Sequence, residues 1–396
     1  MKHASRFLLF SNEAVGLGHL KRALAITGRL ARTDPDATSL IVTGSPVQVV
    51  FDLPPRVEVM TLPTLMRDGN GAHHARRLAL DAPDVARLRG NIARAAALAF
   101  EPDCAVVDRL PLGLEGELGP TLEALRASGC RLVLGLRDIE DDPAKVRRAW
   151  GPDVRGAIRR LYDHVLVYGP DSPGLDAIDC LHWDADNLPV PVHHVGYVGG
   201  GTNGSGPADA TGDYVLATVG GGSDGYAVLA TFLEALRLEP LPCPAIVVTG
   251  PLMSGEEVER LQALADGLAA QVWRFRPHLD ALIARARAIV CMAGYNTVAE
   301  VMRARRPALL VPRTVPSTEQ LLRASELARR GLQDVLHPDD LSAPAMRGAL
   351  GRVLARPRPP LEDEHYRGTE RTAEILAGLA ESSGRRGSGH AMAVTR

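Results

Sequence analysis

Residues 198–212, with the sequence VGGGTNGSGPADATG, divide this chain more sharply than any other stretch. Runs of Gly, Ser, Asn and Pro supply few side chains for a core and are typical of linkers. On both sides of the run, short apolar segments alternate with helical ones, which is the pattern of α/β domains. We therefore predict an N-terminal domain at 1–197, a C-terminal domain at 213–381 and a disordered tail at 382–396.

The composition limits the classes of partner. With a formal net charge of -2 and only 4% aromatic residues, the chain has neither the basic excess nor the stacking platforms of nucleic-acid binding. The cysteines are scattered and never spaced as CxxC, which favours buried free thiols over a zinc site. There is no run of about 18 apolar residues, and the apolar run 7–10 is too short for a signal peptide. We expect a cytoplasmic protein without metal, cofactor or transmembrane segment, and peripheral membrane contact stays open.

In the N-terminal half, polar side chains follow three strand-like runs. The loop 11–19 leads from the first strand into a helix and ends at His19. Because the carboxyl ends of parallel strands share one edge, the three polar clusters should converge on one crevice. A capping histidine, salt bridges and helix caps are the alternatives. The residues that follow the two later strands are Asp108, Arg109, Arg137 and Asp138.

Two further segments of this half each allow two interpretations. Lys21 and Arg22 fall in a first helical turn, where cations are mildly unfavourable for the helix dipole. A nearby anion would explain them, but a solvated pair is the more common cause. Residues 66–77 are predicted to be a mobile loop, either over a pocket or simply solvated.

The C-terminal half contains two strand-to-helix turns rich in glycine. The strand 214–219 leads into Gly220–Gly225, and the strand 288–292 leads into Gly294 and a new helix. Helix starts of this kind bind anions such as phosphate through free N–H groups and the helix dipole. Glu300, about two turns into the second helix, could accept hydrogen bonds from sugar hydroxyls. An ordinary strand–turn–helix is the alternative.

Together these motifs resemble the GT-B glycosyltransferases. GLGHLKRALAI at 16–26 looks like the N-terminal loop and helix of that class. AGYNTVAE at 293–300 is similar to a signature of the bacterial enzyme that adds N-acetylglucosamine to the lipid-linked peptidoglycan precursor, and TVGGGSDG at 218–225 resembles its second glycine loop. VDRLPLGLEGEL at 107–118 and LGLRDIEDDP at 134–143 look like a little-characterised group of predicted bacterial glycosyltransferases.

The resemblance implies a fold of two Rossmann-like α/β/α domains that face each other across a cleft. It also implies inverting, metal-independent transfer of a sugar from a nucleotide diphosphate, with UDP favoured, to an acceptor hydroxyl. His19 would be the general base or an electrostatic partner, and Asp108 is the second catalytic candidate. The implied acceptor-side residues are Gly18, Arg109, Arg137 and Asp138.

The resemblance also implies a donor site, in which groups of residues take different parts of the donor. Two loop residues and a helix start would hold the diphosphate, an aromatic–arginine pair would flank the base, a glutamate would bind the ribose, and a Glu-Gln pair would bind the sugar. The loop and helix-start residues are Gly222, Ser223, Gly294, Tyr295, Asn296 and Thr297. Phe275 and Arg276 are the aromatic–arginine pair, Glu300 is the glutamate for the ribose, and Glu319 and Gln320 are the pair for the sugar.

Some residues depart from the pattern of the cell-wall enzyme. Gly199–Gly201 stand where that enzyme has a phosphate-binding arginine, and Glu319 replaces a glutamine. Two other functions stay open. One is a UDP-sugar hydrolase in which His19 activates water, and the other is a nucleotide-sugar-binding protein without catalysis. The acceptor, the sugar and the choice between uracil and thymine are not determined by these motifs.

Overall fold

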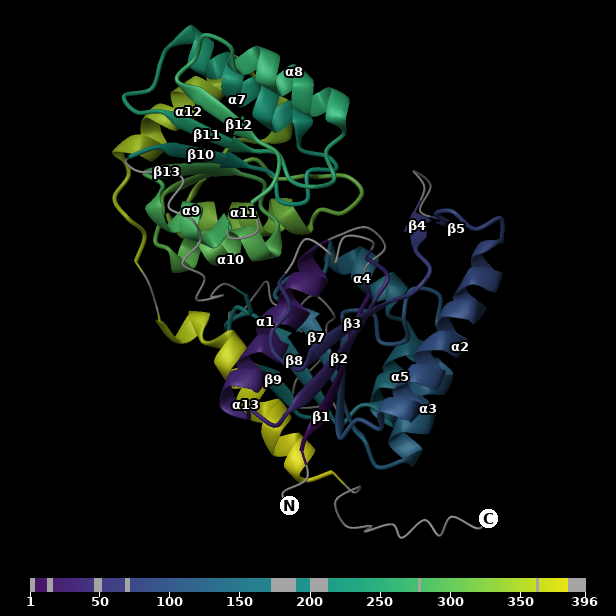
Figure 1. The fold of residues 1–396 in the computed structure, drawn as a ribbon. Coiled ribbons are helices and arrows are strands. Elements are labelled where there is room, and N and C mark those ends of the chain that lie inside the picture. Colours follow the sequence, from purple (N-terminus) through teal and green to yellow (C-terminus); the bar gives the residue numbers. More distant parts are fainter. Residues whose placement is uncertain are drawn as a thin grey trace, which may run out of the picture. The chain divides into compact units, whose positions relative to one another are not determined.

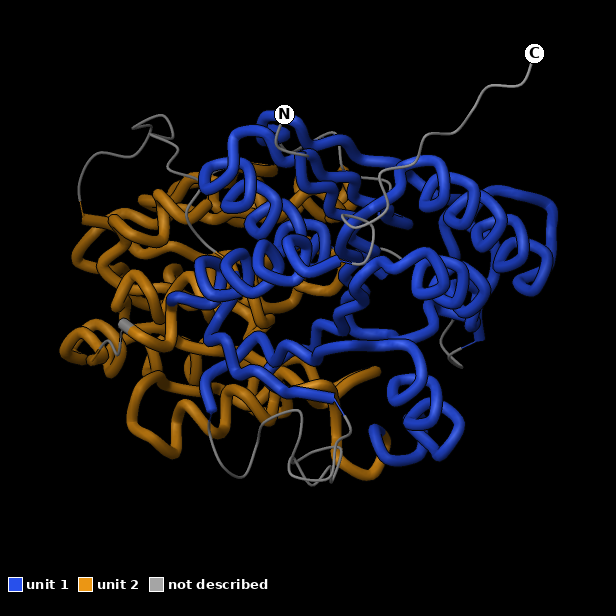
Figure 2. Tube along the Cα trace, turned by 90° about the horizontal axis from the view of Figure 1, so that it is seen from below, with its two compact units in different colours: residues 1–138, 146–198, 367–396 blue, residues 139–145, 199–366 orange. Residues whose placement is uncertain are grey.

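The computed structural model forms two compact units (Figure 1). Unit 1 combines residues 1–138, 146–198 and 367–396, and unit 2 combines 139–145 and 199–366 (Figure 2). Most of the predicted linker and tail lies outside the described residues. The structure describes residues 4–12, 17–45, 52–67, 72–171, 190–199, 213–276, 279–360 and 363–383.

Unit 1 is built on a seven-stranded parallel sheet in the described part of the chain, with strand order β3-β2-β1-β6-β7-β8-β9. Helices cover both of its faces, so the central strands are apolar and buried, as parallel sheets require. The strands are β1 (Arg6–Ser11), β2 (Thr38–Thr43), β3 (Val57–Thr61), β6 (Cys104–Asp108), β7 (Arg131–Arg137), β8 (His164–Tyr168) and β9 (Val192–His194). The helices are α1 (Gly18–Thr33), α2 (Ala82–Phe100), α3 (Gly119–Ala127), α4 (Pro143–Ala149, which spans the boundary between the units), α5 (Pro152–Leu161) and α13 (Gly368–Glu381).

The described residues of unit 2 form a six-stranded parallel sheet with order β12-β11-β10-β13-β14-β15. Alternate residues of β10 enter two separate apolar clusters, Val215 and Ala217 on one face and Leu216 on the other, because side chains alternate along a strand. The strands are β10 (Val215–Thr218), β11 (Ala245–Val248), β12 (Ala270–Trp273), β13 (Ala288–Cys291), β14 (Ala308–Leu310) and β15 (Asp334–Val335). One face packs against α7 (Tyr226–Leu238), α8 (Gly255–Ala265) and α12 (Ala343–Ala355), and the other against α9 (Leu279–Arg285), α10 (Tyr295–Arg303) and α11 (Glu319–Arg329). The described part of unit 2 also contains the short 3-10 helices η3 (Pro338–Asp340) and η4 (Asp363–Tyr366).

The C-terminal helix belongs to unit 1, although the sequence predicts it in the domain 213–381. α13 packs along α1, and the two appear side by side in Figure 1. Gly368 begins α13 so close to the backbone oxygens of Gly196 and Tyr197 that a Cβ would clash with them. The C-terminal limit of the predicted domain 213–381 is therefore wrong, because a helical period in the sequence does not reveal which sheet the helix covers.

The segment 66–77, predicted as a loop, contains a short antiparallel hairpin instead. β4 (Leu65–Arg67) pairs with β5 (His73–Ala75), and residues 68–71 between them lie outside the described part. Three of the cysteines are buried free thiols, as predicted, and Cys243 is half-buried; Cys180 is outside the described residues. Among the described helices, none is long and apolar enough to cross a membrane.

Candidate functional site

His19, Arg22 and Asp108 form a buried network at the carboxyl edge of the unit 1 sheet. Asp108 is the last residue of β6, which pairs with β1, and His19 lies in the first turn of α1. His19 Nδ1 is 3.1 Å from Asp108 Oδ2. Arg22 donates from Nε at 3.0 Å and from Nη2 at 2.8 Å to the same oxygen. Of the predicted edge residues, His19 and Asp108 are thus brought into direct contact.

The network keeps the carboxyl group of Asp108 ionised. Burial by itself would raise its pKa, but the charge of Arg22 and the contact with His19 outweigh burial and lower the pKa to about 2. A hydrogen on His19 Nδ1 can be donated to this carboxylate, which leaves a lone pair on Nε2. Nδ1 is also 3.0 Å from Arg22 Nη2, so the opposite tautomer can accept from the guanidinium. The position of one hydrogen therefore decides whether Nε2 can act as a base.

Arg22 is buried, although a cation in the first turn of a helix is more commonly exposed to solvent. Its side chain is 2% exposed, its anion is Asp108, and its guanidinium lies 5.1 Å from the centre of the Tyr168 ring. Tyr168 ends β8 and lies against Gly135 of β7, where a Cβ would meet its phenol. Because Gly135 has no side chain, the Tyr168 ring can pack against it and contact the Arg22 guanidinium.

The other residues that were predicted at this edge also lie at or directly after the carboxyl ends of strands. Arg109 adopts a positive φ of 74° directly after β6, and its N–H donates to Gly135 O at 2.7 Å. Arg137 ends β7, and Asp138 is buried against Gly169. The ends of β1, β6 and β7 are neighbours, as predicted.

In unit 2 the two glycine motifs follow neighbouring strands, β10 and β13. Gly222 has a φ of 92° and lies so close to Thr249 O that a Cβ would clash, so this loop requires glycine. A Cβ built on Gly220 would lie 3.9 Å from Thr297 Oγ1, which shows how near the loop is to α10. The glycine loop after β10 therefore lies next to the start of α10.

Gly294 precedes α10 with φ -65° and ψ 143°, a conformation open to any residue. The turn therefore does not depend on the conformational freedom of glycine at residue 294. Gly294 supplies no capping side chain, and the first N–H groups of α10 point out of the helix. Glu300 is about one and a half turns inside α10 and only 4% exposed.

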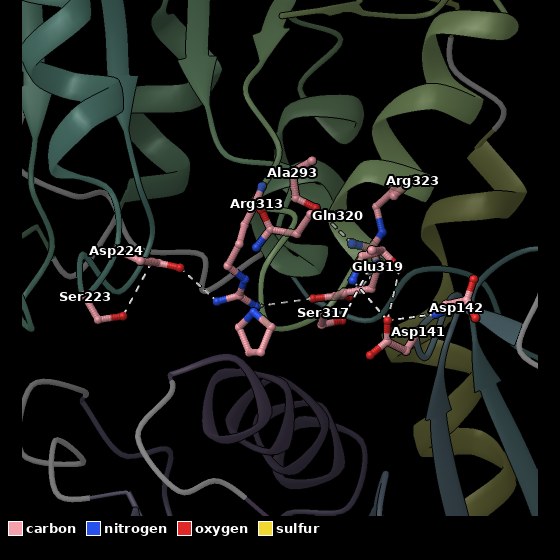
Figure 3. Close-up of polar contacts among 12 residues, drawn as sticks. Asp141, Asp142, Ser223, Asp224, Ala293, Arg313, Ser317, Glu319, Gln320 and Arg323 are labelled. Carbon is pink, nitrogen blue, oxygen red and sulfur yellow. Dashed lines mark hydrogen bonds and ion pairs between the residues drawn. The ribbon is translucent and has the colours of Figure 1, made fainter. Parts of the chain in front are cut away.

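Glu319 and Gln320 begin α11 beside the start of α10 (Figure 3). Arg323 connects the two helices, because it donates from Nη1 to Ala293 O at 2.9 Å and from Nη2 to Glu319 Oε2 at 3.1 Å. Gln320 Oε1 accepts from the backbone N–H of Arg313 at 3.1 Å. Arg313 Nη1 in turn donates to Asp224 Oδ2, beside Ser223, at 2.9 Å.

Phe275 and Arg276 follow β12, two strands away from β10. The Arg276 guanidinium lies 4.3 Å from the centre of the Trp273 ring, and residues 277–278 are outside the described part.

The sequence analysis assigned no site role to Arg22, Tyr168, Asp224, Arg313 or Arg323. The spacing of Glu319 and Arg323, one helical turn apart, was the signal for one of these contacts.

Solved structures of similar fold identify the class. MurG of Acinetobacter baumannii aligns with a TM-score of 0.56 over 95% of this chain and 100% of its own, at 17% identity. The glycotransferase of kitacinnamycin aligns with a TM-score of 0.64 over 96% of this chain and 100% of its own, at 14% identity. The predicted GT-B fold of two Rossmann-like units is therefore confirmed.

Comparisons of the sequence place the chain more closely within that class. Residues 216–374 match the Glycosyltransferase family 28 C-terminal domain. An uncharacterized glycosyltransferase of Methanopyrus kandleri is 31% identical over 176 residues, which are 44% of this chain and 47% of that protein. The UDP-N-acetylglucosamine--N-acetylmuramyl-(pentapeptide) pyrophosphoryl-undecaprenol N-acetylglucosamine transferase of Sinorhizobium fredii is 31% identical over 133 residues, 32% of this chain and 36% of that protein. The matches span less than half the length of these relatives, and the resemblance to GT-B glycosyltransferases is confirmed by fold and domain family together.

Proposed function

We propose that this protein transfers a sugar from a UDP-sugar to an acceptor hydroxyl, with inversion at the anomeric carbon and without a metal. The observation that carries the proposal is the contact between His19 Nδ1 and Asp108 Oδ2 at 3.1 Å. A histidine oriented by an ionised carboxylate is the arrangement that general-base catalysis requires.

In the proposed reaction the acceptor oxygen attacks the anomeric carbon of the donor sugar. Its proton passes to Nε2 of His19, and the bond from the anomeric carbon to the β-phosphate oxygen breaks. The electron pair of that bond leaves with the nucleoside diphosphate, and a single displacement inverts the carbon. Asp108 stabilises the imidazolium, Arg22 positions Asp108, and the ring of Tyr168 supports Arg22.

Unit 2 binds the donor in this proposal. The starts of α7 and α10 follow neighbouring strands and present N–H groups and helix dipoles that can offset the charge of a leaving diphosphate. Glu300 accepts from the ribose hydroxyls, Phe275 and Arg276 flank the base, and Gln320 with Glu319 contacts the sugar. The choice of UDP is supported by the cell-wall relative, whose name states UDP-N-acetylglucosamine as its donor.

The donor half of the proposal is tested by a thermal-shift screen of UDP, TDP, GDP and their sugars, because a ligand of the native state raises the melting temperature. We expect UDP and at least one UDP-sugar to stabilise the protein. Absence of a shift with every nucleoside diphosphate would refute the proposal.

The catalytic half is tested by measuring UDP release from that donor with and without a panel of alcohols, phenols and sugars. His19→Ala should slow acceptor-dependent release by about a hundredfold to ten-thousandfold, with the thermal shift by UDP unchanged. The exposed His74 provides the matched control, His74→Ala, with wild-type release. Full turnover by His19→Ala would sink the proposal, and equal release without any acceptor would identify a hydrolase.

A further inference from the structure

Arg313 reaches across the proposed donor site of unit 2. It lies shortly after β14, whereas its partner Asp224 lies in the glycine loop after β10. In the sheet β13 runs between these two strands. The bond between the side chains therefore bridges the carboxyl end of β13, where α10 begins, and Figure 3 shows Arg313 between Asp224 and Glu319.

The guanidinium of Arg313 has hydrogen-bond donors to spare. An arginine carries five N–H groups, and the Arg313 side chain is 32% exposed. Among the described residues, its buried Nε has no hydrogen-bond partner, and the nearest Glu319 oxygen is 4.0 Å from Nη2, too far for a hydrogen bond. Buried N–H donors are rarely left unpaired in proteins, so these donors indicate a further acceptor.

The charges around Arg313 indicate what that acceptor is. Asp224 and Glu319 are both carboxylates, and either would repel an anionic ligand at the helix starts unless a cation lay between. Arg323 is committed to Ala293 O and Glu319. Arg313 is therefore the cation in this network with donors available, and its planar fork fits two oxygens of one anion.

We propose that Arg313 binds the anionic group of the nucleotide-sugar donor and that Asp224 holds the guanidinium in position for this contact. The inference rests on the proposed function. The diphosphate is the anion that every such donor carries, and the carboxylate of an acidic sugar has the same chemistry. Arg313 would then supply the cation that Gly199–Gly201 cannot supply.

The test is calorimetric titration of the full chain with UDP and with uridine, which lacks the phosphates. Arg313→Gln should weaken UDP binding by at least about tenfold, since charge-assisted hydrogen bonds are lost, while uridine binding stays within about twofold of wild type. Arg313→Lys should lie between, because lysine keeps the charge without the fork. Arg260, paired with Glu256 on the surface of α8, gives the matched control Arg260→Gln with wild-type binding. Thermal unfolding without ligand checks that each variant is folded.

Asp224→Asn separates ligand binding from a purely structural ion pair. If Arg313 contacts the anion, Asp224→Asn should weaken UDP binding much less than Arg313→Gln does, because the amide oxygen still accepts from the guanidinium and a competing negative charge is removed. Weakening by Asp224→Asn equal to that by Arg313→Gln would mean that the pair merely holds the loop, and the proposal would be overturned.

UDP-glucose and UDP-glucuronate distinguish the two sources of the anion. An equal loss for UDP and both sugars in Arg313→Gln supports contact with the diphosphate, and a loss confined to UDP-glucuronate supports contact with the sugar carboxylate. Wild-type binding of all three by Arg313→Gln overturns the inference and leaves the proposed function standing. If the wild-type protein binds none of them, both fall.

Discussion

The Asp141 carboxylate accepts hydrogen bonds from both the backbone N–H of Thr318, at 3.0 Å, and its hydroxyl, at 3.2 Å, across 177 positions of sequence. Thr318 precedes α11 and makes no side-chain cap of its own. A carboxylate from the segment 139–145 therefore caps the helix that begins with Glu319. Lys145 fastens the same segment by donating to Pro316 O at 3.1 Å.

Removing this cap should loosen the start of α11. We expect Asp141→Ala to lower the free energy of unfolding by about 1 kcal/mol, the usual cost of a lost helix cap. Asp141→Asn should cost less, because an amide oxygen still accepts. Urea unfolding measures both, with the exposed Glu259→Ala on α8 as control. Unchanged stability of Asp141→Ala would show that the cap contributes nothing.

The ion pair of Asp108 should make stability depend on pH in the acid range. Its pKa is about 2 in the folded protein against an ordinary 3.8. A lowered folded pKa stabilises above the unfolded value, and this stabilisation, about 2 kcal/mol, is lost as the pH falls through about 4 toward 2. Asp108→Asn should be less stable at pH 7, since buried Arg22 loses its partner, and the gap to wild type should narrow on acidification. A gap that is constant from pH 7 to pH 2 in chemical unfolding would contradict this.

Gly135 should not tolerate a methyl group. In Gly135→Ala the Cβ meets the Tyr168 phenol, so we expect a loss of about 1–3 kcal/mol from overpacking in thermal unfolding. Tyr168→Phe removes the closest atom and should partly restore stability in the double variant. Gly156→Ala in α5, where a Cβ has open space, is the control. Equal stability of both single variants would show that the sheet adjusts around residue 135.

The start of α13 should be equally sensitive. Gly368→Ala places a Cβ against the backbone oxygens of Gly196 and Tyr197, so it should detach the first turn of the helix. Gly378→Ala in the same helix meets no atom within 4 Å and should be neutral or slightly stabilising. Limited proteolysis measures the difference, and matching cleavage rates of the two variants would rule out a tight docking.

The contact between His19 and Asp108 could be predicted from sequence because each follows a strand of a parallel sheet. Strands of this kind are recognised by short apolar runs, and their carboxyl ends share one edge. The role of Arg22 could not be predicted in the same way. A cation in a first helical turn is ambiguous until its partner, 86 positions away, is placed beside it.

Contacts between loops that are far apart in the sequence could not be predicted from the local sequence pattern. The ion pair of Arg313 with Asp224 and the cap from Asp141 to Thr318 depend on how strands are ordered in the unit 2 sheet and on which unit the segment 139–145 joins. Periodicity identifies elements and their buried faces, and it carries no information about partners that the fold brings together.

The docking of α13 on α1 has a consequence for biosynthesis. Among the described helices of unit 1, α1 leaves the ribosome before the others and α13 after them, with all of unit 2 between them in the chain. The face of α1 that α13 covers therefore stays exposed to water and to chaperones until α13 has emerged from the ribosome. Unit 2 can fold as a domain while the nascent chain grows, whereas the packing of α1 in unit 1 is completed only when α13 emerges.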